Sequence, residues 1–521
     1  MSAIARGQQP KRCLSGNQQN QYRHGRLTMW QRQRDRCIAR SLMQSALASL
    51  LLCFSALALA KPNIVFILAD DLGIGDVGAY GGEVISTPHI DALAAGGVLF
   101  EQAYASHPVC SPSRAGLMTG RYQQRHGWEF NPADRIQTSG MAAAEITIAD
   151  VLEDSSYDTG MVGKWHLGYE PKFHPLNRGF GQYFGILSGG SIFIDQSQPG
   201  VESIGQWPLR RDKSKGVYDG EELVQVDAYL TDVFTNKAVD FIKQKRAKPF
   251  FLYVSHTTPH TPLQATKKYL NRYRHIENPA ARIYAAMVAS LDDSVGAMVR
   301  ALQESDQLAN TLVVFSSDNG CADYVRVCSN APFAGFKRYH NEGGIRVPMI
   351  FSWPGQLNPE RYTPMVSLVD LMATFAELAG SNHKTEDSIA LMPFLQGKAG
   401  HPHDYLYWRS SPTRAIRDQR WKLLEYAKSG FSMAELDAAR RVPPPAGGWP
   451  RTAPRGHLTM LYDLRNDPGE TTNLAAQHPE IVARLRAAYN QWDSTLPTKS
   501  ILPATRSTLS EMHGETVQLI F

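Results

Sequence analysis

Two pairs of adjacent oxygen-bearing side chains follow apolar runs in this sequence. Asp70-Asp71 comes after the run 63–69, and Asp318-Asn319 comes shortly after the run 312–316. Adjacent acids repel one another unless a cation or a helix terminus offsets their charge. Carboxylate and amide oxygens are the preferred ligands of Ca²⁺ and Mg²⁺. If both runs are strands, the four side chains can converge on one divalent cation, although an N-cap beside a surface acid would explain either pair alone.

Basic side chains suited to anion binding and proton transfer occur in further short runs. Lys164 and His166 are two residues apart after a predicted strand, and an extended segment would direct both to one side. The run 250–263 contains His256 and His260, whose type titrates near neutral pH. Taken alone, a solvated lysine and a packed histidine would be the usual interpretation of Lys164 and His166, and His256 is expected to be structural.

The run Cys110–Gly120, CSPSRAGLMTG, contains Cys-x-Pro-x-Arg followed by Thr-Gly. It is similar to the signature of type I sulfatases of the arylsulfatase A and N-acetylgalactosamine-6-sulfatase type, in the alkaline phosphatase superfamily. In that family a maturation enzyme oxidises the cysteine to formylglycine, whose hydrated aldehyde attacks a sulfate ester and later expels the sulfate. The resemblance thus implies a formylglycine-generating enzyme as a partner. On its own, Cys110 would be interpreted as a small buried cysteine beside a helix start.

The resemblance covers roughly residues 61–490 and implies one bound calcium ion. Calcium is expected rather than magnesium because so many carboxylate and amide ligands leave little room for water. The implied ligands are Asp70, Asp71, residue 110 in its formylglycine form (Cys110), Asp318 and Asn319.

The resemblance also implies catalytic roles. Lys164, within Gly-Lys-Trp-His-Leu-Gly, would bind a sulfate oxygen, and His166 would contact the formylglycine hydroxyl. The family's histidine between two prolines selects His260, which would protonate the leaving oxygen. Lys337, before a Glu-Gly-Gly-x-Arg-x-Pro segment, would touch the sulfate and the bridging oxygen. Arg114, four residues after Cys110 on one helical face, would hold the formylglycine hydroxyl and an acidic neighbour.

Two features concern the substrate. Arg338-Tyr339 stands where the family often has Gly-Thr, and this departure is expected to affect substrate fit. The segment 189–220 holds basic residues and one tryptophan that could contact an acidic sulfated saccharide, although a solvated loop is an equal interpretation. These side chains are Trp207, Arg210, Arg211, Lys213 and Lys215.

Apolar strand-like runs alternate with helical patterns, which predicts an α/β fold with a large, mostly parallel sheet sandwiched by helices. Ligands of such sheets bind at the carboxyl ends of the strands, where the candidate residues cluster. The predicted catalytic domain is 61–405, and 406–521 is a C-terminal subdomain with a small antiparallel sheet, a helix and a tail. The expected strands are 63–69, 159–162, 250–255, 312–316 and 348–353, with short strands in 414–424 and 461–464; the expected helices are 113–120, 284–302 and 479–492.

Residues 1–60 have the pattern of a leader with a secretory signal peptide. Several arginines precede an apolar stretch, 46–60, that ends Ala-Leu-Ala, so cleavage is expected after Ala60 and the protein is expected in the periplasm or outside the cell. The apolar stretch is short for an anchor, so no stable membrane insertion is expected after its removal. Translation could begin at Met1 or Met29.

Loss of the leader changes the charge and the cysteine content. Residues 1–60 hold nine Lys and Arg side chains and one acid, so their removal takes the formal net charge from +5 to −3 and gives no reason to expect nucleic acid as a partner. Three cysteines remain, and an exported protein would pair Cys321 with Cys328. Cys110 is then the odd thiol, for which conversion to formylglycine supplies an explanation.

The expected function is an exported sulfatase acting on a sulfated small molecule or, more specifically, a sulfated carbohydrate. A phosphonate monoester or phosphodiester hydrolase of the same superfamily is one alternative. A non-catalytic binder of sulfated glycans is another, if residue 110 is never matured.

Overall fold

The computed structural model describes residues 61–132, 138–204, 215–397, 399–429, 456–497 and 507–520. The predicted leader lies outside these residues. Trp207, Arg210, Arg211 and Lys213 of the predicted saccharide-contacting loop lie outside them too.

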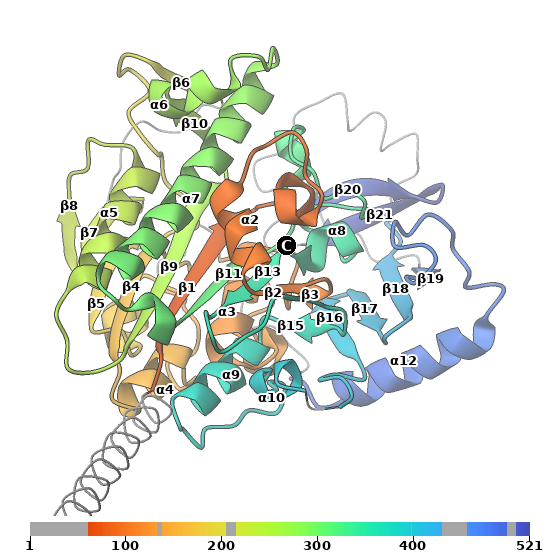
Figure 1. The fold of residues 1–521 in the computed structure, drawn as a ribbon. Helices are drawn as coiled ribbons and strands as arrows, with labels where there is room; N and C mark the ends of the chain where they lie inside the picture. The colour runs from red at the N-terminus through yellow and green to blue at the C-terminus, as the bar shows by residue number, and fades with distance from the viewer. Residues whose placement is uncertain are drawn as a thin grey trace, which may run out of the picture. The chain divides into compact units, whose positions relative to one another are not determined.

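A large mixed sheet forms the centre of the fold (Figure 1). Among the described residues it has ten strands, in the order β14 (Glu360–Tyr362), β2 (Val98–Phe100), β13 (Met349–Ser352), β11 (Thr311–Ser317), β1 (Asn63–Asp70), β9 (Phe250–Pro259), β4 (Asp158–Lys164), β5 (Gln182–Ile186), β7 (Val217–Asp219) and β8 (Glu222–Val224). The five central strands, from β11 to β5, are parallel, whereas β13, β7 and β8 run antiparallel to their neighbours. The predicted α/β class is therefore confirmed, with antiparallel pairs towards the edges.

Side chains of β1 alternate between two apolar layers, because successive residues of a strand point to opposite faces. Ile64, Phe66 and Leu68 pack in one layer, and Val65 and Ile67 pack in the other. Burial on both faces explains why the strand is a continuous apolar run.

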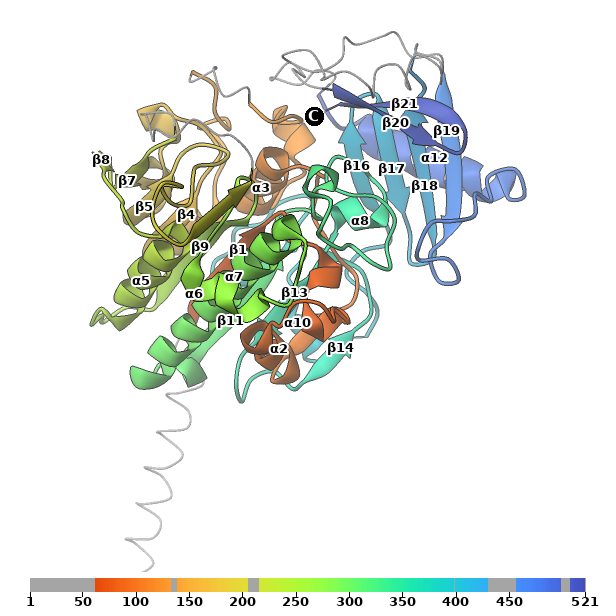
Figure 2. The ribbon, with the colours of Figure 1, turned by 90° about the horizontal axis from the view of Figure 1, so that it is seen from above.

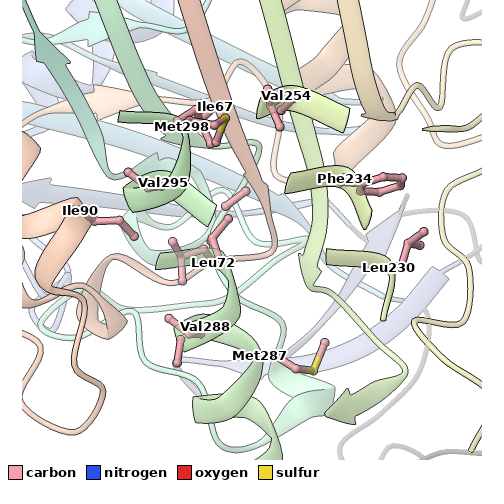
Figure 3. Close-up of a cluster of buried hydrophobic side chains, with 14 of the residues drawn as sticks. Ile67, Leu72, Ile90, Leu230, Phe234, Val254, Met287, Val288, Val295 and Met298 are labelled. Atoms are coloured by element: carbon pink, nitrogen blue, oxygen red, sulfur yellow. The ribbon is translucent and has the colours of Figure 1, made fainter. Parts of the chain in front are cut away.

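Helices cover both faces of the sheet (Figures 1 and 2). The layer that contains Phe66 includes residues of α3 (Cys110–Thr119), α4 (Ile148–Asp154) and α9 (Asp370–Leu378). The layer that contains Ile67, part of which is drawn in Figure 3, includes residues of α2 (Pro88–Ala95), α5 (Leu230–Lys243) and α7 (Pro279–Glu304). Helix α7 begins earlier than the predicted residue 284 because Asn278 caps it, accepting hydrogen bonds from the backbone N–H groups of Ala280 and Ala281.

The C-terminal part contains the predicted small antiparallel sheet and helix. The strands are β16 (Leu406–Ser410), β17 (Thr413–Arg417), β18 (Trp421–Ala427) and β19 (His457–Asp463), and the helix is α12 (Pro479–Asp493). Leu485 and Trp492 of α12 pack against Ile416 and Leu423 on one face of this sheet. The predicted boundary between residues 405 and 406 stays a prediction.

The final residues contain a hairpin that the sequence pattern did not indicate. Strands β20 (Ser507–Met512) and β21 (Glu515–Ile520) pair with one another, and Val517 bridges to Lys428 after β18. Val517 and Leu519 pack with Leu424 and Tyr426 on the sheet face opposite α12. In the described part of the chain, no helix is both long and apolar enough to cross a bilayer.

Candidate active site

The carboxyl ends of β1 and β11 bring the two predicted acidic pairs together. These neighbouring parallel strands end at Asp70 and Ser317, so the side chains that follow meet at one edge of the sheet. The Asp71 N–H donates to Asp318 Oδ1 (3.2 Å), and Asn319 Nδ2 donates to Asp71 Oδ1 (2.7 Å). These four side chains and the fifth predicted ligand, Cys110, are all buried.

The donor set fits a hard divalent cation. Oδ1 of Asp70 and Oδ1 of Asn319 are buried acceptors, and neither receives a hydrogen bond from the described residues. Buried polar atoms are normally satisfied, so a pair of orphaned oxygens among three carboxylates indicates a site for a cation. Potential ligand atoms of Asp70, Asp71, Cys110 and His260 also lie within 4.8 Å of one another.

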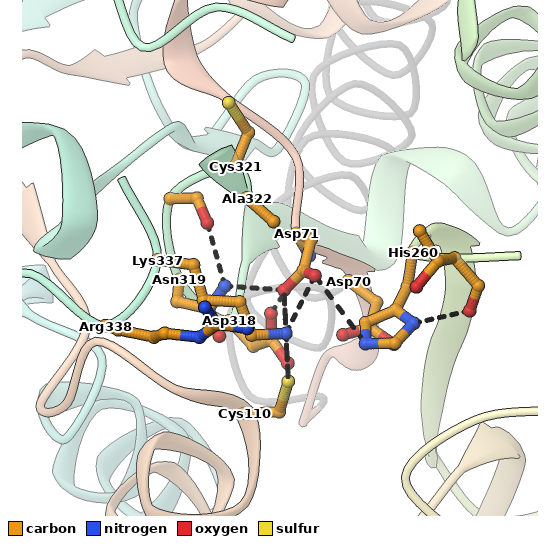
Figure 4. Close-up of polar contacts among 12 residues, drawn as sticks. Asp70, Asp71, Cys110, His260, Asp318, Asn319, Cys321, Ala322, Lys337 and Arg338 are labelled. Carbon is orange, nitrogen blue, oxygen red and sulfur yellow. Dashed lines mark hydrogen bonds and ion pairs between the residues drawn. The ribbon is translucent and has the colours of Figure 1, made fainter. Parts of the chain in front are cut away.

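Cys110 is the first residue of α3, three residues earlier than the sequence predicted. Pro112 permits this start because its missing N–H falls in the first turn, where no intrahelical partner exists. Gly120 ends the helix in the left-handed conformation (φ 62°). The Cys110 Sγ lies 3.0 Å from Lys337 Nζ and 3.8 Å from Asp71 Oδ1 (Figure 4). Burial raises the pKa of this thiol to about 12, so the unmodified side chain is a neutral thiol at neutral pH.

Arg114 lies one helical turn after Cys110 and holds the acidic neighbour that was predicted. Its Nε donates to Asp318 Oδ2 (2.8 Å), and its Nη1 donates to the backbone oxygen of Lys164 (3.1 Å) and to Ser255 Oγ. Its Nη2 lies 3.6 Å from Asp70 Oδ1. The side chain is 1% exposed, so it positions two acids from beneath the site.

Lys164 and His166 both reach the site, but the extended geometry predicted for them is wrong. Lys164 is the last residue of β4, and its Nζ donates to Asp70 Oδ2 (2.7 Å). His166 has φ 59°, the left-handed region, so the strand does not continue through it. Its ring packs against Gly189, where a Cβ would lie 2.6 Å from Nε2. Burial, together with the charge of Lys164, holds the pKa of His166 well below its usual range.

His260 follows β9 and directs one ring nitrogen towards the acids, whereas His256 does not. His260 Nδ1 lies 2.7 Å from the backbone oxygen of Thr261, which leaves Nε2 facing Asp71 Oδ2 at 3.6 Å. Burial and the nearby Lys337 lower the pKa of His260 to about 3. His256 is fully buried against Ser294 Oγ (3.0 Å) and plays a packing role, as the sequence indicated.

Lys337 connects the acid cluster to residue 110. Its Nζ donates to Asp71 Oδ1 (2.6 Å) and Oδ2 (2.7 Å), so Asp71 lies between Lys337 and His260 (Figure 4). Burial alone would raise the pKa of Asp71, but Lys337, His260 and Lys164 together outweigh it and hold that pKa below its usual range. Burial also raises the pKa of Asp318, to about 6.

A cavity of about 330 Å³ opens above these residues. Cys110, His166, His260 and Lys337 line it, as predicted. Its other lining residues include Asn131, Lys215, Thr261, Tyr324 and Arg338. Asn131, Thr261 and Tyr324 were not predicted. Tyr324 could have been suspected because it lies between two paired cysteines just after Asn319; the predicted Cys321–Cys328 disulfide is present.

Buried acids, lysines and histidines thus lie at the carboxyl ends of a central parallel sheet, as in alkaline-phosphatase-like α/β folds. The family model described as Sulfatase matches residues 62–381. The chain belongs to the sulfatase family and is a sulfuric ester hydrolase.

Relatives and solved structures agree with this assignment. The chain is 34% identical over 466 residues to N-acetylgalactosamine-6-sulfatase of Homo sapiens, covering 84% of this chain and 86% of the relative. It is 29% identical to N-acetylgalactosamine-6-O-sulfatase of Bacteroides thetaiotaomicron, covering 82% and 92%. The solved structure of Ps i-CgsB in complex with k-i-k-neocarrahexaose has a TM-score of 0.72 at 33% identity, covering 84% of this chain and 94% of that one.

Proposed function

We propose that this chain is an exported sulfatase that removes sulfate from a sulfated saccharide, with residue 110 in its formylglycine form and one bound Ca²⁺. The observation that carries the proposal is the position of Cys110, which starts a helix with its Sγ 3.0 Å from Lys337 Nζ and 3.8 Å from Asp71. A saccharide is favoured because relatives are named for N-acetylgalactosamine sulfate and a similar structure holds a carrageenan hexaose.

The modified residue and the cation each supply one part of the chemistry. Hydrated formylglycine supplies a nucleophilic hydroxyl and a second hydroxyl that allows sulfate to be released. Ca²⁺ would be held by Asp70, Asp71, Asp318 and Asn319 and would supply positive charge for anionic oxygens. A formylglycine-generating enzyme is the partner that this proposal requires.

The chain's own cations hold the sulfate group. Lys164 and Lys337 are buried and point to the acids around residue 110, so a sulfate seated above Cys110 meets two ammonium groups. Preorganised charges of this kind stabilise the charge that develops in the transition state, usually the largest catalytic contribution.

Two histidines move the protons. His260 Nδ1 donates to the Thr261 carbonyl, so Nε2 is the ring atom that faces the substrate. In the imidazolium form, which a bound anionic sulfate favours, Nε2 can give its proton to the departing alcohol oxygen. His166, on the cavity wall, can accept a proton from the group at residue 110 during sulfate release. Arg114 contacts no substrate in this scheme; it fixes Asp318 and Asp70.

The test begins with the mass of the peptide that contains residue 110, from protein expressed with a maturation enzyme. An aldehyde in place of the thiol, together with turnover of 4-nitrophenyl sulfate, is expected. C110S should attack the sulfate ester at most once and slowly, without turnover, whereas C110A should not react with it at all. Multiple turnovers by C110S, or faster hydrolysis of an aryl phosphonate than of the matched aryl sulfate, would refute the proposal.

A further inference from the structure

The wall of the active-site cavity beyond Lys337 carries an arginine in an unusual backbone conformation. Arg338 lines the cavity and has φ 82°, in the left-handed region that disfavours side chains. Its N–H donates to the backbone oxygen of Pro108 (2.8 Å), two residues before Cys110. A non-glycine residue held at positive φ beside an active site suggests a functional role for its side chain, because such strained residues cluster at functional sites.

A disulfide-closed loop orients the Arg338 guanidinium. The loop runs from Cys321 to Cys328 and contains Asp323 and Tyr324. The guanidinium lies 4.9 Å from the centre of the Tyr324 ring, and Nη1 lies 3.8 Å from Asp323 Oδ1. Stacking on an aromatic face holds a planar guanidinium more firmly than it would hold a lysine ammonium.

Tyr324 connects this guanidinium to the predicted cation site. Its hydroxyl donates to Asp71 Oδ2 (3.2 Å), while its side chain remains 40% exposed in the cavity wall. Arg338 is therefore coupled through one ring to an acid at the base of the cavity. If the sulfate ester of a substrate lies at the base of the cavity, the rest of the substrate would lie along the wall that Tyr324 and Arg338 form.

The charges distinguish the base of the cavity from its wall. At the base, three carboxylates (Asp70, Asp71, Asp318) face three basic side chains (Arg114, Lys164, Lys337). In the described part of the wall, Arg338 and Lys215 carry positive charges, and the Arg338 guanidinium lies near the Asp323 carboxylate. An anion bound there would be attracted independently of the group being hydrolysed.

We propose that Arg338, oriented by Tyr324 and Asp323, is a specificity-determining residue that binds a second anionic group of the substrate, a sulfate or a carboxylate, near the sulfate that is hydrolysed. This inference rests on the proposed function and narrows its substrate class to saccharides with at least two anionic groups. The guanidinium fork can engage two oxygens of such a group while it stays stacked on Tyr324.

The test measures competition against 4-nitrophenyl sulfate in the formylglycine-bearing enzyme. The competitors are N-acetylgalactosamine 6-sulfate, which has one anion, its 4,6-disulfate, and the 6-sulfate joined to a glucuronate. Tighter binding of the disulfate alone, or of the glucuronate alone, would identify the second anion as sulfate or carboxylate. The variants are R338Q, which keeps a planar polar group, and R338K, which keeps one charge. The control is R326Q, because Arg326 is an exposed cation of the same loop that does not line the cavity.

The wild-type enzyme is expected to bind at least one doubly charged competitor about tenfold more tightly than the singly charged one. R338Q should weaken binding of the doubly charged competitor about 10- to 100-fold more than binding of the singly charged one. This is the range for loss of a charge-assisted hydrogen bond. R338K should lose part of this preference and R326Q none of it. No preference in the wild type, or equal losses for all competitors in R338Q, would overturn the inference; a matured wild type that cannot hydrolyse 4-nitrophenyl sulfate would overturn the proposed function itself.

Discussion

Lys422 of β18 is the centre of a buried ionic cluster, and its replacement should be strongly destabilising. Its Nζ lies 2.9 Å from an oxygen of Glu342 and 2.9 Å from an oxygen of Glu470, and all three side chains are 0% exposed. Glu342 also contacts Arg346 (3.3 Å) and Arg417 (3.7 Å). Burial alone would raise the pKa of Glu342, but Lys422 and the arginines outweigh it and lower that pKa to about 2.

K422M removes a charge that two buried carboxylates share. Glu342 keeps two arginines, but among the described residues Glu470 keeps only the Glu342 N–H as a hydrogen-bond donor (2.7 Å). Removing one partner of a buried ion pair costs roughly 3–5 kcal/mol, because the other charge stays buried and uncompensated. K422M should therefore lower the free energy of unfolding by about that amount.

Urea unfolding followed by tryptophan fluorescence measures the change. The double variant K422M/E470Q should recover at least about half of the loss, because it removes the unpaired acid. K428M is the matched control: Lys428 follows the same strand, but its pair with Glu515 is partly exposed, so its loss should cost less than about 1 kcal/mol. The reasoning is wrong if K422M costs no more than K428M, or if E470Q adds to the loss.

Three further predictions concern acidity, the cation and the disulfide. Burial raises the pKa of Asp76 to about 7, so the folded state retains a proton that the unfolded chain loses near pH 4. The free energy of unfolding should therefore fall as pH rises between about 4 and 7. In urea unfolding, D76N should reduce that fall by up to about 4 kcal/mol. An unchanged dependence of the free energy of unfolding on pH would contradict this. EGTA should lower the melting temperature, since a cation held at 100 to 1,000 times its Kd stabilises by about 3–4 kcal/mol, and Ca²⁺ should restore it. A melting temperature indifferent to both would exclude a resident calcium ion. C321S/C328S should cost about 2 kcal/mol and raise the KM for 4-nitrophenyl sulfate, because the loop that holds Tyr324 is released; an unaltered KM would show that the loop does not shape the cavity.

The acidic end of the site could be predicted because local sequence and sheet geometry agree there. An apolar run buried on both faces identifies β1, and the acids that end it must lie at the carboxyl edge of the sheet. The parallel pairing of β1 with β11 then brings Asp318 within hydrogen-bonding distance of Asp71, independently of the conformation of the loops. Lys164 could be placed for the same reason, since it ends β4 two strands away.

Other features depend on contacts with residues far away in the sequence, which a local sequence pattern cannot predict. His166 has a left-handed backbone, which alternation along an extended segment cannot anticipate. The hairpin of residues 507–520 is stabilised by packing on a sheet formed far earlier in the chain. Glu342 belongs to a motif visible in the sequence, yet its partner Lys422 lies 80 residues away. The position of Arg338 above Tyr324 likewise depends on how two loops fold together.

The balance of charges would allow the site to hold the proposed cation and then to attract an anion. Three buried carboxylates are matched by three buried basic groups, so the protein alone adds no net charge from these six side chains. A divalent cation then makes the site positive by two, which is the condition for attracting a sulfate ester into a buried cavity. Without Lys164 and Lys337 the same cation would leave the site neutral, and its net attraction for sulfate would be lost. The lysines would therefore act before any bond is broken. They neutralise the carboxylates, so that the positive charge of the bound cation attracts the sulfate.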